Sequence, residues 1–315
     1  MEFGSASRPW YKKRKYQFLM LVLAALLLLS FLPYLYHAPV TASQTRLNKS
    51  VDYFAHIYNL TTGLIPEYPG SHTFWLYSDN YLAALALSRY DPRNGPTSNF
   101  ASALETAMGG YRATLSPLLQ RNQYTALNST STSFNCSMNY ALSWAAANGS
   151  DPKGSTAMLK TTANDQGNIC SSQNYADLLF LQAVYYHRLK NDSAAQHFYQ
   201  RGASDFDGVG IKDIPFMTMG SGSFNSYQTY KLALYLYAGA CLGTQTNDSN
   251  YPKLLSILLM QQDNLTGGFY SGYYFGGLRS AYYLLTFPST PHPNTETTAL
   301  AALALEQLIR PSSSC

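Results

Sequence analysis

The pattern of apolar and polar positions predicts a chain built almost entirely from helices. From Ser43 onward, apolar residues recur at helical spacing, the alternation typical of strands is scarce, and glycine and proline interrupt the pattern at short intervals. The expected helices span residues 44–58, 78–90, 98–119, 137–148, 172–190, 192–204, 226–241, 250–262, 272–285 and 294–309. No long low-complexity linker separates them, so we expect one domain over residues 46–310.

Some of these helices open with small polar residues and are then apolar on almost every side. They contain the stretches SDNYLAALAL, SMNYALSWAA, SQNYADLLFL, SYQTYKLALYLY and NTETTALAALAL. A helix of this kind is surrounded by protein. The helices between them, such as 98–119 and 192–204, keep a polar face. This alternation predicts two concentric rings, with the buried helices inside and the amphipathic helices outside.

One loop and the helix after it are similar to a known superfamily. The loop GGFYSGY at 267–273, followed by NTETTALAALAL, resembles the Gly-Gly-aromatic loop and the inner helix of several α/α-toroid, or six-hairpin, proteins. The resemblance covers most of residues 45–310 and implies an all-α toroid of about five to six helical hairpins. The superfamily includes glycoside hydrolases, polysaccharide lyases, sugar epimerases, terpene cyclases and protein prenyltransferases, so it does not select an activity.

The motifs of particular branches are absent from the sequence. The chain has no Cys-Gly-Glu-Gln thioester, no Asp-x-Asp-Asp motif of cyclases and no paired Asp-Asp of fungal mannanases. Its six histidines show no His-Glu-x-x-His spacing, so no zinc site is expected.

The N-terminal segment predicts a membrane anchor. A basic cluster, YKKRK, precedes the apolar run Phe18–Leu32, and basic residues on that side should stay in the cytoplasm. We expect a basic cytoplasmic tail over 1–16, a transmembrane signal anchor over 17–36 and a stalk over 37–45. The alternative is a signal peptide cleaved near Ala42, which would give a secreted body.

The distribution of charge argues against a nucleic-acid partner. The formal net charge is +4, and the basic residues of the tail account for the whole excess. The remaining chain is neutral, so it carries no electrostatic footprint for a polyanion.

Eight Asn-x-Ser/Thr sites follow the apolar segment and favour a glycosylated outer face. They are Asn48, Asn59, Asn128, Asn135, Asn148, Asn191, Asn247 and Asn264. We expect Asn264, which lies between an apolar helix and a double glycine, to occupy an exposed turn.

The four cysteines contain no Cys-x-x-Cys pair, so a disulfide is favoured over zinc. Cys136 and Cys170 would close a loop of modest length and are the candidate pair. A free, buried Cys241 is an equally weighted alternative, and four cysteines allow three pairings.

The starts of the buried helices supply the candidate functional residues. In a toroid these ends face a central cavity, and glycoside hydrolysis needs two carboxyl groups across it. The candidate catalytic residues are Asp79, Asp177, Glu296 and Glu67. The candidate ligand-binding residues are Trp75, Tyr77, Asn80, Asn139, Asn174, Tyr230, Tyr270 and Tyr273, because sugar rings stack on aromatic faces and their hydroxyls bind polar groups.

Each carboxylate also has a structural interpretation. Ser78 or Asp79 is a good helix N-cap, and Glu296 beside a capping Asn294 complements the helix dipole. Asp177, expected past the first turn of a buried helix, is harder to explain as structure, because a buried carboxylate must be paired or protonated.

The stretch DFDGVGIKD gives a weak indication of calcium. Asp205, Asp207 and Asp213 have part of the EF-hand spacing, but Val209 and Phe216 occupy positions where the ligands are acids. The alternative is a glycine-rich turn after the helix at 192–204.

The sequence therefore predicts a membrane-anchored, extracellular, glycosylated α/α-toroid protein that is a carbohydrate-active enzyme of the hydrolase or lyase type. The alternative is a surface glycoprotein without catalysis, which binds glycan or protein or assembles with itself.

Overall fold

The computed structural model describes residues 43–71, 74–90, 96–112, 123–128, 141–144, 175–213, 226–275, 286–311 and 315. The contacts divide the chain into two units, Met1–Ser43 and Gln44–Cys315. The expected tail and anchor, residues 1–36, lie outside the described residues. Within the described residues, no helix is long and apolar enough to cross a membrane.

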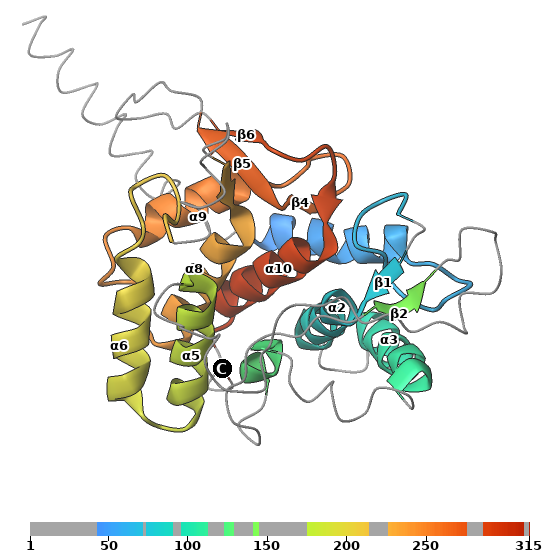
Figure 1. Ribbon diagram of the computed structural model, residues 1–315, viewed down its shortest axis with the longest axis horizontal. Helices are drawn as coiled ribbons and strands as arrows, with labels where there is room; N and C mark the ends of the chain where they lie inside the picture. Colours follow the sequence, from blue (N-terminus) through green and yellow to red (C-terminus); the bar gives the residue numbers. More distant parts are fainter. Residues whose placement is uncertain are drawn as a thin grey trace, which may run out of the picture. The chain divides into compact units, whose positions relative to one another are not determined.

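The described part of the chain is mostly helical, with eight α-helices, a 3-10 turn and small sheets (Figure 1). The helices span residues 43–57, α2 (Tyr77–Tyr90), α3 (Pro96–Arg112), α5 (Ala176–Arg188), α6 (Asp192–Ala203), α8 (Thr229–Cys241), α9 (Tyr251–Met260) and α10 (Thr295–Ile309), and the 3-10 turn is η1 (Gln123–Leu127). The expectation of a mostly helical chain is confirmed.

Three small antiparallel sheets fix where several helices begin. They consist of β1 (Phe74–Leu76) with β2 (Ala141–Trp144), of β3 (Ser226–Gln228), β5 (Gly272–Phe275) and β6 (Thr286–Pro288) in the order β3-β5-β6, and of β4 (Phe269–Tyr270) with β7 (Pro293–Asn294). Strands β1, β3 and β7 each run directly into a helix, namely α2, α8 and α10. Pairing of the strand therefore sets the position of the first helical turn.

Most of the expected helices are confirmed, and two stretches are wrong. Observed helices match the expected 44–58, 78–90, 192–204, 250–262 and 294–309 to within two residues. The expected helix 137–148 contains strand β2, and the expected helix 272–285 begins with strand β5. In β5, Tyr273 stacks on Tyr227 of β3, with ring centroids 5.5 Å apart. Pairing with strands distant in the sequence outweighs helical spacing here.

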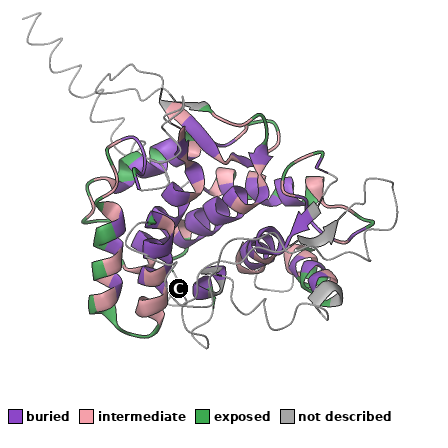
Figure 2. Cartoon of the chain, in the orientation of Figure 1, coloured by how far each residue is buried: buried purple, intermediate pink, exposed green. Residues whose placement is uncertain are grey.

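The helices that are apolar on every side are buried and pack next to one another. Helix α10 packs against α2 and α8, α8 packs against α5, and α5 packs against η1. Figure 2 shows α10 and α8 buried along most of their length. The amphipathic helices α3, α6 and α9 each pack on the buried helix that precedes them in the chain. The described residues thus form helical hairpins, but they do not show a closed ring.

A double glycine lets the loop before β4 approach the first helix. Gly267 has a φ of +83°, and a Cβ added there would lie 2.2 Å from the carbonyl oxygen of Lys49. A Cβ on Gly268 would lie 2.5 Å from the ring of Tyr53. Only glycine fits both the conformation and the space, so this loop packs directly on the helix at 43–57.

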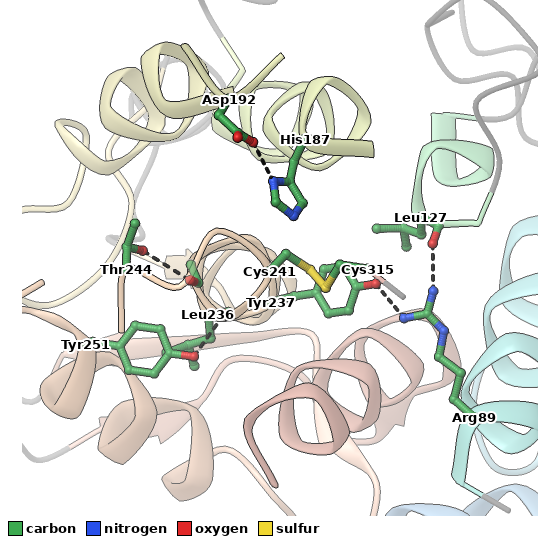
Figure 3. Close-up of a disulfide and its surroundings, with 11 residues drawn as sticks. Arg89, Leu127, His187, Asp192, Leu236, Tyr237, Cys241, Thr244, Tyr251 and Cys315 are labelled. Carbon is green, nitrogen blue, oxygen red and sulfur yellow. Dashed lines mark hydrogen bonds and ion pairs between the residues drawn. A yellow bond between two sulfur atoms is a disulfide. The ribbon is translucent and has the colours of Figure 1, made fainter. Parts of the chain in front are cut away.

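A disulfide and an arginine lie side by side at the end of α8 (Figure 3). Cys241, the last residue of α8, is bonded to Cys315, so the expectation of a free Cys241 is wrong. Beside it, the Arg89 guanidinium of α2 donates to the Tyr237 hydroxyl and, over 2.7 Å, to the Leu127 carbonyl oxygen. The sequence missed this pair because Cys315 lies 74 residues away, in a tail without helical pattern.

The other candidate disulfide remains a prediction. Cys136 and Cys170 lie outside the described residues. Because Cys241 is bonded to Cys315, the remaining two of the four cysteines can pair within the chain only with each other.

Candidate functional site

Four carboxyl groups gather where the buried helices begin. Asp79 is the third residue of α2, Asp177 the second of α5 and Glu296 the second of α10, and Glu67 lies on the loop before β1. Charge on Glu296 and Glu67 raises the pKa of Asp79, and charge on Asp177 and Glu67 raises the pKa of Glu296. We call these four residues the acid cluster. Each of the four candidate catalytic residues is therefore close enough to at least one of the others for their charges to interact.

The start of α8 belongs to the same place. The hydroxyl of Tyr230, in the first turn of α8, interacts with the charges of Asp177 and Glu296. Since the first turns of α2, α5, α8 and α10 meet, and these helices pack side by side, all four run in the same direction. Their positive dipole ends therefore point towards the acid cluster.

Burial is the largest cause of a raised pKa in every member of the acid cluster. For Glu67, the raised pKa is due to burial. The pKa of Asp79 is raised well above its usual range by burial and then by its neighbours' charges, while the hydrogen bond from Ser78 lowers it. A carboxyl group that loses its water without gaining a cation favours the neutral form. The acid cluster should therefore hold protons at a pH where carboxyl groups are usually ionised.

Glu67 is positioned by a clamp between α2 and α10. The Asn80 side chain accepts a hydrogen bond from the Ile65 amide over 2.7 Å and donates to the Ile65 carbonyl oxygen over 3.0 Å. Thr295 donates from its hydroxyl to Pro66 O over 2.6 Å and from its amide to Glu67 O over 2.8 Å. Asn80 is fully buried and positions this loop, and its expected role in binding a ligand stays a prediction.

Asp79 is the most enclosed member of the acid cluster. Its side chain is 1% exposed, its Oδ1 accepts from the Ser78 hydroxyl over 3.0 Å, and its Oδ2 has no hydrogen-bond partner in the structure. Helix α2 begins at Tyr77, so Ser78 and Asp79 lie inside the first turn, and the expectation that one of them caps the helix is wrong. A buried oxygen without a partner is costly unless the group is protonated.

Glu296 is partly exposed and is held by a tyrosine that the sequence did not indicate. The hydroxyl of Tyr124, on η1, donates to Glu296 Oε1. After burial, this hydrogen bond is the next influence on the pKa of Glu296 and lowers it, whereas the charges of Asp177 and Glu67 raise it. The Asn294 side chain accepts from Thr297 N over 3.0 Å, which confirms Asn294 as the cap of α10.

Asp177 lies in the first turn of α5 and not beyond it. Helix α5 begins at Ala176, four residues later than expected. Asp177 is partly exposed, and its Oδ1 is enclosed with no hydrogen-bond partner among the residues that the structure describes. Burial raises its pKa, the charge of Lys231 lowers it, and the charge of Asp213 raises it.

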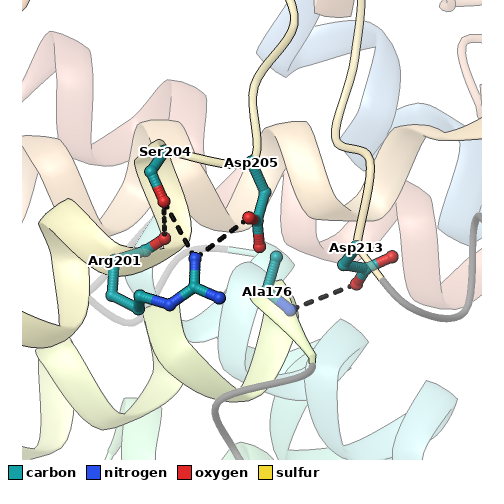
Figure 4. A network of polar contacts seen from close by, with 5 residues as sticks. All are labelled: Ala176, Arg201, Ser204, Asp205 and Asp213. Atoms are coloured by element: carbon teal, nitrogen blue, oxygen red, sulfur yellow. Dashed lines mark hydrogen bonds and ion pairs between the residues drawn. The ribbon is translucent and has the colours of Figure 1, made fainter.

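A buried ion pair adjoins Asp177. The Lys231 ammonium contacts Asp213 Oδ2, and the two side chains are 1% and 0% exposed. Asp213 Oδ2 also accepts from the Ala176 amide over 3.1 Å, so it fixes the start of α5 (Figure 4). This pair was not predicted from the sequence. Lys231 is the one charged residue within the apolar stretch SYQTYKLALYLY, a signal that could have indicated a buried carboxylate partner.

The calcium interpretation does not fit the loop at 205–213. Its three carboxylates bind three different cations: Asp205 with Arg201, Asp207 with Lys212 and Asp213 with Lys231. Val209 N and Gly210 N donate to Asp207 Oδ1, as in a glycine-rich turn. Among the residues that the structure describes, no three His, Cys, Asp or Glu side chains are grouped to hold a metal ion.

The expected aromatic ligand-binding residues divide into buried and accessible groups. Trp75, Tyr77 and Tyr273 are 3%, 1% and 0% exposed, so they are core residues here, and a ligand-binding role for them stays a prediction. Tyr230 and Tyr270 are partly exposed. The candidate residues Asn139 and Asn174 lie outside the described residues.

The described glycosylation sites lie mainly on the surface. Asn48, Asn128, Asn191, Asn247 and Asn264 are exposed, and Asn59 is half-buried. The expectation that Asn264 lies in an exposed turn is confirmed. Asn135 and Asn148 lie outside the described residues, and attachment of glycan at any of the eight sites stays a prediction.

A cavity of about 280 Å³ lies on the other side of α2. Its lining includes Tyr77, Tyr81, Glu105 and Met108. Helical spacing places Tyr77 and Tyr81 on the face of α2 opposite Asp79. This cavity is therefore separate from the acid cluster.

No family model, curated protein or solved structure matches this chain.

Proposed function

We propose that the chain is a glycoside hydrolase whose acid and base are members of the acid cluster. The observation that carries this proposal is the convergence of four carboxyl groups from four separate segments, each with a raised pKa. Ionised carboxyl groups that are buried together destabilise the folded state, so stability does not explain why the cluster is present. Hydrolysis of a glycosidic bond needs one protonated carboxyl group and one carboxylate close together.

Glu296 fits the general acid. It is partly exposed, and burial together with the charges of Asp177 and Glu67 raises its pKa. It can therefore keep a proton for the leaving oxygen. The Tyr124 hydroxyl fixes the carboxyl group in one orientation.

Asp177 fits the base or nucleophile. Its pKa is also raised by burial, but the charge of Lys231 lowers it, so the lysine favours the ionised form. Acid–base catalysis needs one carboxyl group protonated and the other ionised, and the lysine near Asp177 favours that division of roles. Asp79 is enclosed, and burial together with the charges of Glu296 and Glu67 raises its pKa, so it favours the neutral form beside the other carboxyl groups.

The charges near the acid cluster favour hydrolysis over β-elimination. A polysaccharide lyase removes a proton next to a uronate carboxylate, and a cation or another hydrogen-bond donor stabilises the charge that develops there. Among the described residues, Lys231 is the one cation that acts on the acid cluster, and it is buried against Asp213. An anionic substrate would meet further negative charge here, so we propose an uncharged glycan.

We propose that the helical hairpins continue into an α/α toroid around the acid cluster. Two features support this: the buried helices run in one direction with their first turns together, and an outer helix follows each of α2, α5 and α8. We also propose that the domain faces outward from a membrane anchor at residues 17–36. The basic cluster before the apolar run and the exposed glycosylation sites support this orientation.

The experiment is a substrate screen with the full-length chain purified in a mild detergent. The probes are uncharged oligosaccharides of different linkage and uronate polymers, with detection of new reducing ends and of unsaturated sugar products. The proposal expects new reducing ends from an uncharged glycan. Unsaturated products from a uronate polymer would show a lyase instead, and binding of a glycan without cleavage would show a surface glycoprotein without catalysis.

A further inference from the structure

Two exposed aromatic rings stack beside the acid cluster. Tyr68 directly follows Glu67, and His292 lies four residues before Glu296. The two rings are within 8° of parallel, with centroids 6.1 Å apart. Tyr68 is 40% exposed and His292 is also exposed. The sequence did not indicate this pair, because the two residues are more than two hundred positions apart.

The backbone on both sides of the ring pair is fixed. The Ser71 amide donates to Tyr68 O over 3.0 Å, and the Thr290 hydroxyl donates to His292 O over 3.2 Å. Next to His292, Pro293 belongs to strand β7 and accepts from the Tyr53 hydroxyl over 3.2 Å. The clamp that positions Glu67, through Thr295, joins the same two segments. The rings therefore keep a set position relative to Glu67 and Glu296.

This exposure contrasts with that of three other aromatic candidates. Trp75, Tyr77 and Tyr273 are 3%, 1% and 0% exposed. An exposed pair of parallel rings presents an apolar surface to water. Because the rings are not buried, they contribute little hydrophobic free energy to the stability of the fold. Sugars have apolar C–H faces that pack on such rings, while their hydroxyls stay in water or bind polar groups.

We propose that Tyr68 and His292 form a subsite that binds one uncharged sugar ring of a glycan chain next to the acid cluster. This inference rests on the proposed function and adds to it a residue set for substrate recognition. We take the sugar to be uncharged because the charged groups on the same two segments, Glu67 and Glu296, are carboxyl groups, which when ionised would repel a uronate or a sulfated ring. The ring bound here lies away from the reacting bond and supplies binding energy for longer substrates.

The test measures binding in the full-length Glu296→Gln variant, in which turnover is removed. The probes are uncharged oligosaccharides of two to six sugars and a uronate oligosaccharide of equal length, titrated calorimetrically. Tyr68→Ala should weaken binding of the longer uncharged probes by about tenfold, which corresponds to about 1.4 kcal/mol. Tyr68→Phe should bind within about twofold of the parent, because the ring face is kept.

Leu265→Ala is the matched control, because Leu265 is 95% exposed in the turn that contains Asn264 and has no part in the site. It should bind like the parent. Thermal unfolding of each variant shows that the fold is kept, so a loss of binding can be assigned to the missing ring.

The outcomes separate the subsite from the proposed hydrolysis. Equal binding by Tyr68→Ala and the parent overturns the subsite, even where the wild-type chain cleaves the probe. A tenfold loss in Tyr68→Ala, with no cleavage by the wild-type chain, supports the subsite and contradicts the hydrolase. If no uncharged probe binds, or if the uronate binds more tightly, the subsite is overturned.

Discussion

Replacing Lys231 with methionine should destabilise the protein strongly, because it breaks a buried ion pair. The two side chains, Lys231 and Asp213, are 1% and 0% exposed and join the start of α8 to the start of α5. Methionine fills a similar volume but leaves the Asp213 carboxylate without its cation. Breaking a buried pair in this way costs about 3–5 kcal/mol, because one charge stays buried and uncompensated.

The assay is reversible denaturant unfolding of the full-length chain, with two further variants. Lys231→Met combined with Asp213→Leu removes both charges and should recover most of the loss, since an apolar pair of similar volume is often neutral. The matched control is Arg201→Met, which breaks the Arg201–Asp205 pair on the surface of α6, where the arginine side chain is 46% exposed. That change should cost at most about 1 kcal/mol.

The same variant should change the pH dependence of turnover. Lys231 lowers the pKa of Asp177, so its removal raises that pKa. Asp177 would then ionise at higher pH, and the acidic limb of the rate profile would move to higher pH. The reasoning is refuted if Lys231→Met costs no more than Arg201→Met, or if the double variant is as unstable as the single one.

Acidity, the disulfide and the glycosylation sites each give a further expected outcome. Because the pKa of Asp79 is raised in the folded state, its contribution to stability is fully present below the unfolded value of about 4 and is lost as pH rises through the folded value. Asp79→Asn should therefore be more stable than the wild-type chain at pH 7 and show a flatter dependence on pH between 4 and 8, measured by thermal unfolding; an unchanged slope would contradict a raised pKa. Cys315→Ser should lower the free energy of unfolding by up to about 4 kcal/mol, since the bond closes a loop of 74 residues, and a loss below about 0.5 kcal/mol would count against the Cys241–Cys315 bond. Glycopeptide mapping from the native host should find glycan at exposed sites such as Asn264, and a chain without glycan at any of the eight sites would contradict the extracellular orientation.

The helical part of the fold could be predicted because the signal is local. An apolar pattern on every side marked α10 and α8 as buried, and small polar residues marked their starts. Strand pairing depends on segments far away in the sequence, and for this reason β2 and β5 were mistaken for helix. The same limit applies to the Cys241–Cys315 bond.

The acid cluster could be predicted in part for a related reason. Carboxylates at the starts of apolar helices were visible as a pattern, so Asp177 and Glu296 were identified. Their surroundings were not visible, since Tyr124, which binds Glu296, and Lys231, whose charge acts on Asp177, come from other parts of the chain. The sequence also did not indicate which aromatic side chains are exposed. Trp75, for example, is a residue type that often stacks on sugars, but it lies in the core.

The central claim is that the acid cluster performs acid catalysis, and turnover of the Glu296→Gln variant tests it most directly. The substrate is the uncharged glycan cleaved in the screen, and the matched control is Asp52→Asn, which changes an exposed carboxylate on the helix at 43–57. Glutamine keeps an acceptor for the Tyr124 hydroxyl but has no proton to give, so kcat should fall at least about a hundredfold while Asp52→Asn keeps wild-type turnover. Turnover of Glu296→Gln within about threefold of the wild-type value, measured on protein of unchanged thermal stability, would contradict the claim.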